Sequence, residues 1–310
     1  MAVHTIPNAR SSNGFREDSL LDRRRLVALT VCDNPTHDLH PVVCGDLMPE
    51  GHKTHFIARQ QTDLLVGDPL RVTSPQGRFR ADARRVTGKR LESVEAVGKH
   101  LFYRFEGDRI VHIHLGRYGK FRQHASPPPR PVGQVRMRIR NSVVAIDLTG
   151  PTTCRLIDPQ QQSSVNSRLG PDPLAGGRKS DVWKNISRSS KPIGALLLDQ
   201  SIVAGVGNIF RAEVLFETEL DPEIAGNQLS RESFDRLWRS LSKMMKTGLK
   251  YGRIISVTAR EAGMPISRVD GKDRFRVYGK TDCPRCGRLI ESIELASRRL
   301  YLCKGCQTGM

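Results

Sequence analysis

The chain has 310 residues, of which 38% are hydrophobic, so it is long enough for two domains with buried cores and one smaller module. Its 50 Lys and Arg against 32 Asp and Glu give a formal net charge of +18, which favours a polyanion such as nucleic acid through counterion release. No stretch approaches the roughly 18 apolar residues of a membrane span, and residues 1–30 hold no secretory signal. A membrane span and secretion are therefore not expected, and a cytosolic compartment with reduced thiols is.

Residues 1–47 differ from the rest of the chain. Residues 8–25 are polar and charged and end in three consecutive arginines, a composition that predicts disorder. An apolar helical pattern begins at Met48-Pro49-Glu50-Gly51, and Gly67-Asp68-Pro69 ends it. We therefore expect an extension up to residue 47 and a helix that starts near residue 48.

Residues 70–157 are expected to form a β-sandwich. Short apolar or alternating runs recur here, with turn signals at Gly107-Asp108 and Asn141-Ser142. Several short strands at this spacing are typical of a sandwich. The runs begin at Leu70, Leu91, His100, Ile110, Val135 and Val143.

The second half of the chain is predicted to be helical. Residues 159–180 are rich in Gln, Ser, Pro and Gly and are interpreted as a hinge. Amphipathic stretches follow at 193–198, 209–215 and 234–249. Between the first two, Gly205-Val206-Gly207-Asn208 has two interpretations: its N–H groups and the next helix N-terminus bind a phosphate, or it is a tight turn between helices.

The strongest chemical signal lies in four cysteines near the C-terminus. Cys283-Pro-Arg-Cys286 and Cys303-Lys-Gly-Cys306 are separated by sixteen residues. Two such pairs suit a tetrahedral Zn²⁺ ion, and the Ile-, Leu- and Arg-rich segment between them predicts a β-hairpin with arginines at its tip. A disulfide pair is the alternative, which a reducing compartment disfavours. Three other cysteines are isolated and are interpreted as incidental: Cys32, Cys44 and Cys154.

Taken in order, the motifs resemble those of the formamidopyrimidine-DNA glycosylase/endonuclease VIII family of base-excision repair enzymes. They cover residues 48–310, nearly all of the chain beyond the extension. The matching stretches are Met48-Pro49-Glu50-Gly51, Gly98-Lys99-His100-Leu101, His114-Leu115-Gly116, Leu169-Gly170-Pro171, Leu198-Asp199-Gln200, Gly205-Val206-Gly207-Asn208-Ile209, Val277-Tyr278-Gly279 and the four cysteines.

This resemblance implies an α+β fold with three units. Residues 48–160 would form a catalytic β-sandwich domain with flanking helices, residues 175–258 a helix–two-turns–helix domain that binds DNA, and residues 259–310 a zinc finger. Damaged double-stranded DNA would lie in the cleft between the first two. One structural Zn²⁺ ion is expected, and its ligands would be Cys283, Cys286, Cys303 and Cys306.

In such an enzyme Pro49 is the expected nucleophile. If Met48 is removed, Pro49 presents a secondary amine; an α-amino group has a pKa of about 7.7–8.0 against about 10.4 for lysine, so a useful fraction is neutral near pH 7. Attack on C1′ of the damaged nucleotide would give a cationic iminium, an electron sink that drives β- and then δ-elimination of the phosphates. Without the family motifs, Pro49 would be interpreted as an ordinary proline in the first turn of a helix.

The resemblance implies roles for further residues. Glu50 would be a general acid/base that helps to open the deoxyribose ring, and Lys99 would contact the phosphate beside the lesion. Asn208, with Gly207, would bind a phosphate from the helix–two-turns–helix domain. Arg298 would hold the phosphates of the lesion from the tip of the zinc finger, and Arg299 beside it competes for this role.

The damaged base must leave the stack before Pro49 can reach C1′, and a wedge must fill the gap. Arg117 and Tyr118 follow His114-Leu115-Gly116, where relatives place wedge residues. A guanidinium can pair or stack and a tyrosine ring can stack, so both suit this role. An ordinary exposed turn is the alternative.

Two departures from the formamidopyrimidine branch bear on the lesion. The chain has Pro-Glu-Gly-His-Lys instead of Pro-Glu-Leu-Pro-Glu, and Gly51 is the choice of the endonuclease VIII-like branch. The Arg-Arg-Phe-Gly wedge strand has no match near residues 152–156. Both departures disfavour 8-oxoguanine. His52 and Lys53 replace residues that neighbour the site in the family. His52 and His55 are three residues apart without nearby carboxylates, so they do not predict a metal pair.

We therefore expect a bifunctional DNA glycosylase and AP lyase of the endonuclease VIII-like branch, monomeric and cytoplasmic in a bacterium, at the nucleoid. Two alternatives stay open: a non-catalytic zinc-ribbon protein that binds nucleic acid on the same fold, and a monofunctional glycosylase in which Pro49 is never freed. Because Pro49 needs a free amine, residues 1–47 are expected to be a misassigned start or a removable leader, with a regulatory pro-segment as the alternative.

Overall fold

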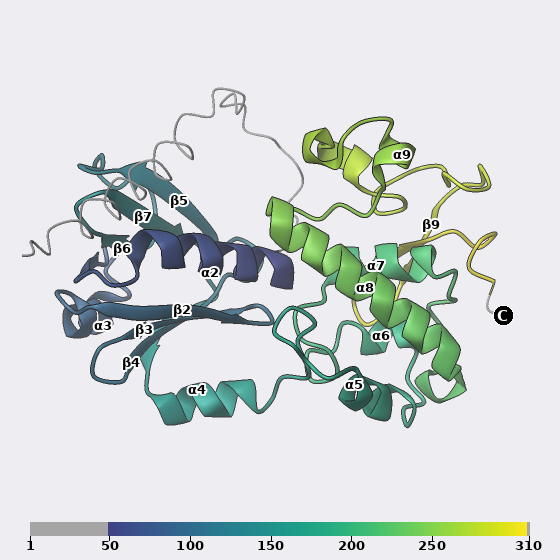
Figure 1. Ribbon diagram of the computed structural model, residues 1–310, viewed down its shortest axis with the longest axis horizontal. Coiled ribbons are helices and arrows are strands. Elements are labelled where there is room, and N and C mark those ends of the chain that lie inside the picture. The colour runs from purple at the N-terminus through teal and green to yellow at the C-terminus, as the bar shows by residue number, and fades with distance from the viewer. Residues whose placement is uncertain (1–48, 309–310) are drawn as a thin grey trace, which may run out of the picture.

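The computed structural model of the chain describes residues 49–308 and has two lobes (Figure 1). The first is a β-sandwich with helices α2 (Gly51–Leu65) and α3 (Arg80–Val86), and the second is helical and carries the cysteine ribbon. The predicted α+β fold class is confirmed. The disorder predicted for residues 1–47 concerns a segment outside the described residues. Within residues 49–308, no helix is both long and apolar enough to cross a membrane.

Two antiparallel four-stranded sheets form the sandwich, with strand orders β1-β6-β7-β5 and β2-β3-β4-β8. Alternate apolar side chains of each strand meet in the core between them, such as Tyr103 and Ile113. The strands are β1 (Arg71–Thr73), β2 (Leu91–Val97), β3 (His100–Phe105), β4 (Arg109–His114), β5 (Lys120–Ala125), β6 (Val135–Arg140), β7 (Val144–Thr149) and β8 (Thr153–Ile157).

One helix lies where the composition predicts a hinge. α4 (Pro159–Asn166) begins at a capping box, in which the Asp158 side chain accepts from the Gln161 N–H and the Gln161 side chain accepts from the Asp158 N–H. The hinge interpretation is therefore wrong for these residues. The sequence patterns do not predict three further elements, because α3 is short and β5 and β8 are partly polar strands at the edges of their sheets.

The long helix α8 (Arg231–Tyr251) supports the second lobe. The Ser230 side chain caps its first turn by accepting from the Ser233 N–H, and Gly252 ends it with a φ of 67°. Its buried face packs against α7 (Asn208–Glu217) and α2. The shorter helices of this part are α5 (Lys179–Ile186), α6 (Ile193–Leu196) and α9 (Ala259–Ala262).

The ribbon packs on the C-terminal end of α7. Its strands β9 (Glu291–Glu294) and β10 (Arg299–Leu302) form the hairpin predicted between the cysteine pairs. Arg285 donates to the Phe216 carbonyl at 3.0 Å and forms an ion pair with Glu219 at 3.0 Å. α7 therefore fixes where the ribbon sits relative to the helical lobe.

At the N-terminus of α2, the backbones of the two lobes are in direct contact, and no side chain fits between them. The Gly51 N–H donates to the Gly205 carbonyl at 2.8 Å, and a Cβ on Gly51 would lie 2.7 Å from the Gly205 Cα. Gly205 also has a φ of 88°, which residues with a Cβ rarely adopt. A backbone-to-backbone contact between the lobes therefore requires both glycines.

Asp172, in the linker between the lobes, ties three segments together. One of its oxygens accepts from the Gly98 N–H at 2.7 Å and lies 2.8 Å from His55 Nε2, while the other accepts from the Leu174 N–H at 2.8 Å. Asp172 is buried, so these bonds replace its hydration. Because Gly98 precedes Lys99, Asp172 also fixes the turn that carries Lys99.

Candidate active site

Pro49 lies in the wall of a cleft of about 770 Å³. Residues from α2, from the loop after β4 and from the segment after α8 line this cleft, and Ile209 of α7 contributes to it. Three of the predicted site residues, Pro49, Arg117 and Tyr118, face it together. The cleft is the place where a substrate could reach Pro49.

Glu50 is 2% exposed, and the first turn of α7 binds its carboxylate. Oε2 accepts from the Gly207 N–H at 2.8 Å and Oε1 accepts from the Ile209 N–H at 2.8 Å, with a longer bond of 3.4 Å from the Phe210 N–H. The first N–H groups of a helix have no partner within it, and the helix dipole favours an anion at this end. Glu50 therefore joins the sandwich lobe to the helical lobe.

Glu50, Lys99 and Arg298 come from three segments, and Lys99 interacts electrostatically with each of the other two. Burial raises the pKa of Glu50, while the Lys99 ammonium and the backbone N–H groups of α7 oppose the rise. Burial lowers the pKa of Lys99, the Glu50 carboxylate opposes the fall, and Arg298 adds to it. Of the three, Glu50 is bonded to the start of α7, and Lys99 is influenced by the charges of both Glu50 and Arg298.

Gly207 and Asn208 have partners within the protein. A Cβ on Gly207 would lie 2.4 Å from Glu50 Cδ, so the packing of the carboxylate explains this glycine. The Gly207 N–H, which is predicted to bind a DNA phosphate, donates a hydrogen bond to the Glu50 carboxylate. The Asn208 side-chain amide donates to the Arg299 carbonyl at 2.8 Å, which places it at the finger tip. The phosphate contacts of both residues stay predictions.

Arg298 lies in the turn of the ribbon hairpin. The Leu295 N–H donates to the Arg298 carbonyl at 3.0 Å, and the two residues between them, Ala296 and Ser297, have φ of 55° and 56°. Positive φ at both central positions matches the twist of a two-residue hairpin but disfavours residues with a Cβ. Arg298 and Arg299 are both exposed, and it is Arg298 that acts on Lys99.

Arg211 is a structural member of the site that the sequence analysis missed. It is fully buried in α7, and its guanidinium donates to the Leu295 carbonyl at 3.0 Å and to the Asn208 side-chain oxygen. Burial lowers its pKa to about 10, and the nearby Glu50 opposes this fall. Arg211 therefore connects the start of α7 to the finger tip. No sequence signal distinguishes it, because an arginine in an amphipathic helix is ordinarily solvated.

Glu213, two residues further along α7, holds the segment that leads into the finger. Its buried carboxylate accepts from the Val277 N–H at 3.0 Å and from the Tyr278 N–H at 2.8 Å. The Val277-Tyr278-Gly279 motif signals this segment in the sequence, but nothing in the motif names its partner.

The loop after β4 holds Arg117 and Tyr118 at the cleft. The Gly119 N–H donates to the Leu115 carbonyl at 2.9 Å and closes a tight turn. Tyr118 is 64% exposed, and the Arg117 guanidinium lies 5.5 Å from the centre of its ring. Both the wedge and the exposed-turn interpretation agree with this arrangement.

His52 and His55 do not form a metal pair. His55 Nε2 lies 2.8 Å from Asp172, whereas His52 packs edge-on against Phe210 with ring centres 5.3 Å apart. Burial lowers the pKa of His52 to about 3, so its ring is neutral near pH 7. Within residues 49–308, the only cluster of at least three potential ligands is formed by the four cysteines.

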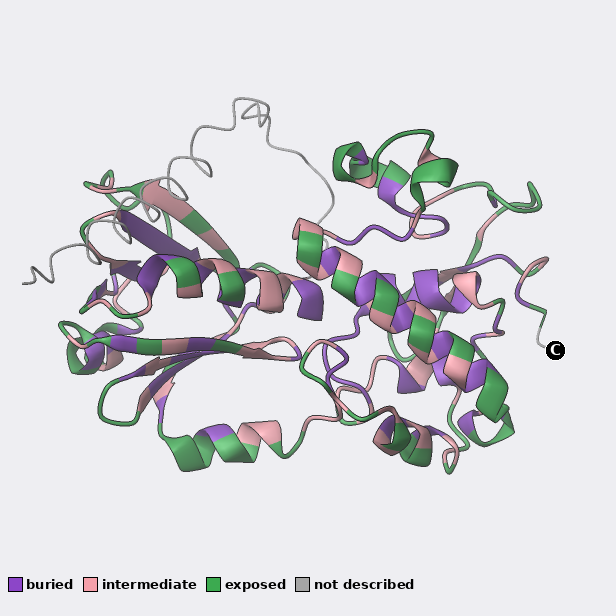
Figure 2. Cartoon of the chain, in the orientation of Figure 1, coloured by how far each residue is buried: buried purple, intermediate pink, exposed green. Residues whose placement is uncertain are grey.

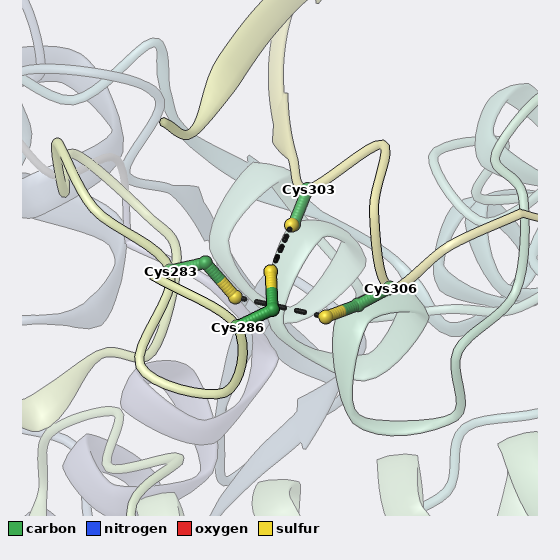
Figure 3. A group of neighbouring side chains, drawn as sticks. All are labelled: Cys283, Cys286, Cys303 and Cys306. Atoms are coloured by element: carbon green, nitrogen blue, oxygen red, sulfur yellow. Dashed lines mark hydrogen bonds between the residues drawn. The ribbon is translucent and has the colours of Figure 1, made fainter. Parts of the chain in front are cut away.

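The four cysteines converge at the base of the ribbon (Figure 3). Their sulfur atoms all lie within 4.8 Å of one another, with 3.7 Å between Cys283 and Cys306 and 3.5 Å between Cys286 and Cys303. Thiolates arranged tetrahedrally at the usual Zn–S distance of about 2.3 Å lie about 3.8 Å apart. The donor set and its spacing therefore fit one structural zinc ion, as the sequence predicts.

Three family models match successive parts of the chain. The N-terminal domain of formamidopyrimidine-DNA glycosylase matches residues 48–165, the H2TH domain of formamidopyrimidine-DNA glycosylase matches residues 169–259, and a zinc finger found in FPG and IleRS matches residues 283–309.

Individual relatives extend over the same region. Endonuclease 8 1 of Mycobacterium tuberculosis is 42% identical over 269 residues, which cover 84% of this chain and 100% of the relative. Formamidopyrimidine-DNA glycosylase of Thermomicrobium roseum is 31% identical over 291 residues, covering 84% and 99%. The structure of Lactococcus lactis Fpg with DNA containing N7-benzyl-Fapy-dG superposes with a TM-score of 0.71 at 26% identity, covering 84% of this chain and 99% of that one.

Replacing a zinc ligand should release the metal and weaken DNA binding. In Cys303→Ser we expect about one equivalent of zinc to be lost, because the hairpin that presents Arg298 is stapled by the metal. Metal analysis and fluorescence anisotropy with a duplex containing an abasic analogue measure both effects, and at least a tenfold loss of affinity is expected. Cys154→Ala, at a buried cysteine of β8, is the control that keeps its zinc. Full DNA affinity in the zinc-free variant would show that the finger does not hold DNA.

Proposed function

This chain belongs to the formamidopyrimidine-DNA glycosylase/endonuclease VIII family of DNA repair glycosylases, and we propose that it is bifunctional, releasing an oxidised base and then cleaving the strand as an AP lyase. One observation carries the proposal. Pro49 lines the cleft next to Glu50, whose buried carboxylate is coupled to Lys99. A protein that only binds nucleic acid would not need the buried Glu50 and Lys99 beside Pro49, whose nitrogen can become a secondary amine.

The proposed reaction begins at the free Pro49 nitrogen. Its lone pair attacks C1′ of the flipped nucleotide, and the bond from C1′ to the base breaks as the base leaves with a proton. Opening of the sugar ring, with protonation of the ring oxygen, leaves an iminium between Pro49 and C1′. Loss of a proton from C2′ then expels the 3′ phosphate, a second elimination expels the 5′ phosphate, and hydrolysis returns the amine.

Glu50 is the proposed general acid/base for ring opening. Its raised pKa, caused by burial, brings proton exchange closer to neutral pH than an exposed carboxyl allows. The bonds from α7 fix the carboxylate beside Pro49. Lys99 is proposed to contact the phosphate next to the lesion. Because burial lowers its pKa, Lys99 is also the amine that competes most directly with Pro49 for the role of nucleophile.

Damaged double-stranded DNA is the proposed substrate, bound by a monomer in the bacterial cytoplasm. Arg298 and Asn208 are proposed to hold its phosphates, with Gly207 supporting the turn, and Arg117 and Tyr118 to fill the gap left by the flipped base. The structure of Lactococcus lactis Fpg in complex with DNA that contains an abasic site superposes on this chain with a TM-score of 0.70. This similarity supports DNA as the ligand. The proposed units are residues 48–160, 175–258 and 259–310.

Only a chain that begins at Pro49 should form a covalent intermediate. With residue 48 attached, the Pro49 nitrogen is an amide whose lone pair is delocalised, so no iminium can form. The family match begins at residue 48, which supports removal of the preceding segment in the active form. Borohydride reduction with abasic-site DNA should trap the protein that starts at Pro49 and should not trap the 310-residue chain. Equal trapping by both forms would mean that another amine, with Lys99 first, is the nucleophile.

Arg298 and Arg299 should differ in their effect on DNA binding. Arg298→Ala is expected to weaken binding about tenfold on every duplex, because a charged hydrogen bond is lost, and to reduce the slope of log K against log salt by about 0.9. Arg299→Ala is the matched neighbour and should change affinity less than threefold. Asn208→Ala should also weaken binding to all sequences alike. A larger effect at Arg299, or a changed lesion preference with an unchanged salt slope, would refute the assignment of Arg298.

Oxidised pyrimidines and abasic sites should be processed faster than 8-oxoguanine opposite cytosine. Gly51 and the missing Arg-Arg-Phe-Gly strand motivate this expectation, and the higher identity to endonuclease 8 1 than to formamidopyrimidine-DNA glycosylase supports it. Duplexes with one lesion each, competing for the same enzyme, give the ratio of kcat/KM values. A clear preference for 8-oxoguanine would place the chain in the other branch.

A further inference from the structure

The exposed face of α8 carries a row of cations. Arg239, Lys243, Lys246 and Lys250 are all exposed and follow one another at spacings of four, three and four residues, which places them on one side of the helix. Figure 2 shows that exposed and buried residues alternate along α8. Residues 236–251 contain no acidic side chain. Among the described residues, none of the four cations forms an ion pair, so like charges face one another along the row.

A groove of about 620 Å³ runs beside this row. All four cations line it, and its other walls come from the linker residues Pro173 and Gly177 and from the half-buried ring of Trp238. No residue that lines it is acidic. The groove therefore combines positive charge with an aromatic surface.

The groove lies on the opposite side of α8 from the candidate active site. The buried side of the helix packs on the turn that receives Glu50, since a Cβ on Gly205 would lie 3.2 Å from the Met245 methyl group. The thickness of α8 thus separates the cation row from Gly207 and Glu50. DNA in the Pro49 cleft would leave the groove free.

We propose that this groove is a second nucleic-acid site that binds single-stranded DNA. Regularly spaced cations complement a phosphate backbone, and an indole at the side of the groove offers a stacking surface that any base can use. A duplex could use only the charges, because its bases are stacked inside. The row from Arg239 to Lys250 extends about 17 Å, which matches about five nucleotides of a stacked strand at about 3.4 Å each.

The test keeps the active site occupied. The protein is first saturated with an unlabelled duplex that contains a stable abasic analogue, and a fluorescein-labelled oligothymidylate is then titrated and followed by anisotropy. Lys243→Glu/Lys246→Glu should weaken binding of the oligothymidylate at least tenfold. It should also reduce the slope of log K against log salt by at least about 1.4, because each of the two lost phosphate contacts contributes about 0.7 on a single strand. Arg84→Glu/Arg85→Glu is the matched control, because it makes the same charge change at exposed positions of α3.

The aromatic contact has its own variant. Trp238→Ala should weaken binding at least about fivefold, and Trp238→Phe should recover most of it; the melting temperature shows whether each is folded. Excision on duplex DNA should stay at the wild-type rate in Lys243→Glu/Lys246→Glu, which separates this proposal from the proposed function. The proposal is overturned if the oligothymidylate does not bind once the cleft is filled, or if the α8 and α3 charge variants behave alike. Polyglutamate competing as well as the oligonucleotide would also overturn it, in favour of an acidic protein partner.

Discussion

The contact between the Glu50 carboxylate and the first turn of α7 determines most of the site geometry. Gly207 and Ile209 donate their N–H groups to it at 2.8 Å each. These donors belong to the helical lobe and the acceptor to the sandwich lobe, so this carboxylate, together with the backbone contact between Gly51 and Gly205, sets how the lobes face each other. It also places Pro49, the preceding residue, in the wall of the cleft. Replacement of Glu50 would therefore disturb lobe geometry as well as the proton transfer proposed for it.

α7 carries this geometry onward to the zinc finger. Its first residue, Asn208, binds the Arg299 carbonyl, and Arg211 binds the Leu295 carbonyl on the other side of the hairpin turn. Ala296 and Ser297 hold the turn at positive φ, and the contacts from Asn208 and Arg211 fix the hairpin from both sides. The zinc ion stabilises the base of this hairpin, while α7 positions its tip.

Local patterns in the sequence predicted the parts of this structure that local chemistry determines. The spacing of Cys283, Cys286, Cys303 and Cys306 and the amphipathic stretch of α8 are such features, and both predictions are confirmed. The Asp158 capping box was also readable, but the polar composition around it obscured α4. The sequence could not predict that Glu50 binds the N–H groups at the start of α7, because Glu50 lies 157 residues from Gly207 in sequence. The roles of Asp172, Arg211 and Glu213 could not be predicted for the same reason, because each binds a backbone group that is distant in sequence.

In the proposed reaction, the Pro49 nitrogen forms the covalent bond to C1′. The most direct measurement is tandem mass spectrometry of the borohydride-reduced adduct between abasic-site DNA and the protein that begins at Pro49. We expect the sugar remnant on the amino-terminal nitrogen of the peptide that starts at Pro49. A remnant on the side chain of Lys99, with an unmodified Pro49, would contradict the account.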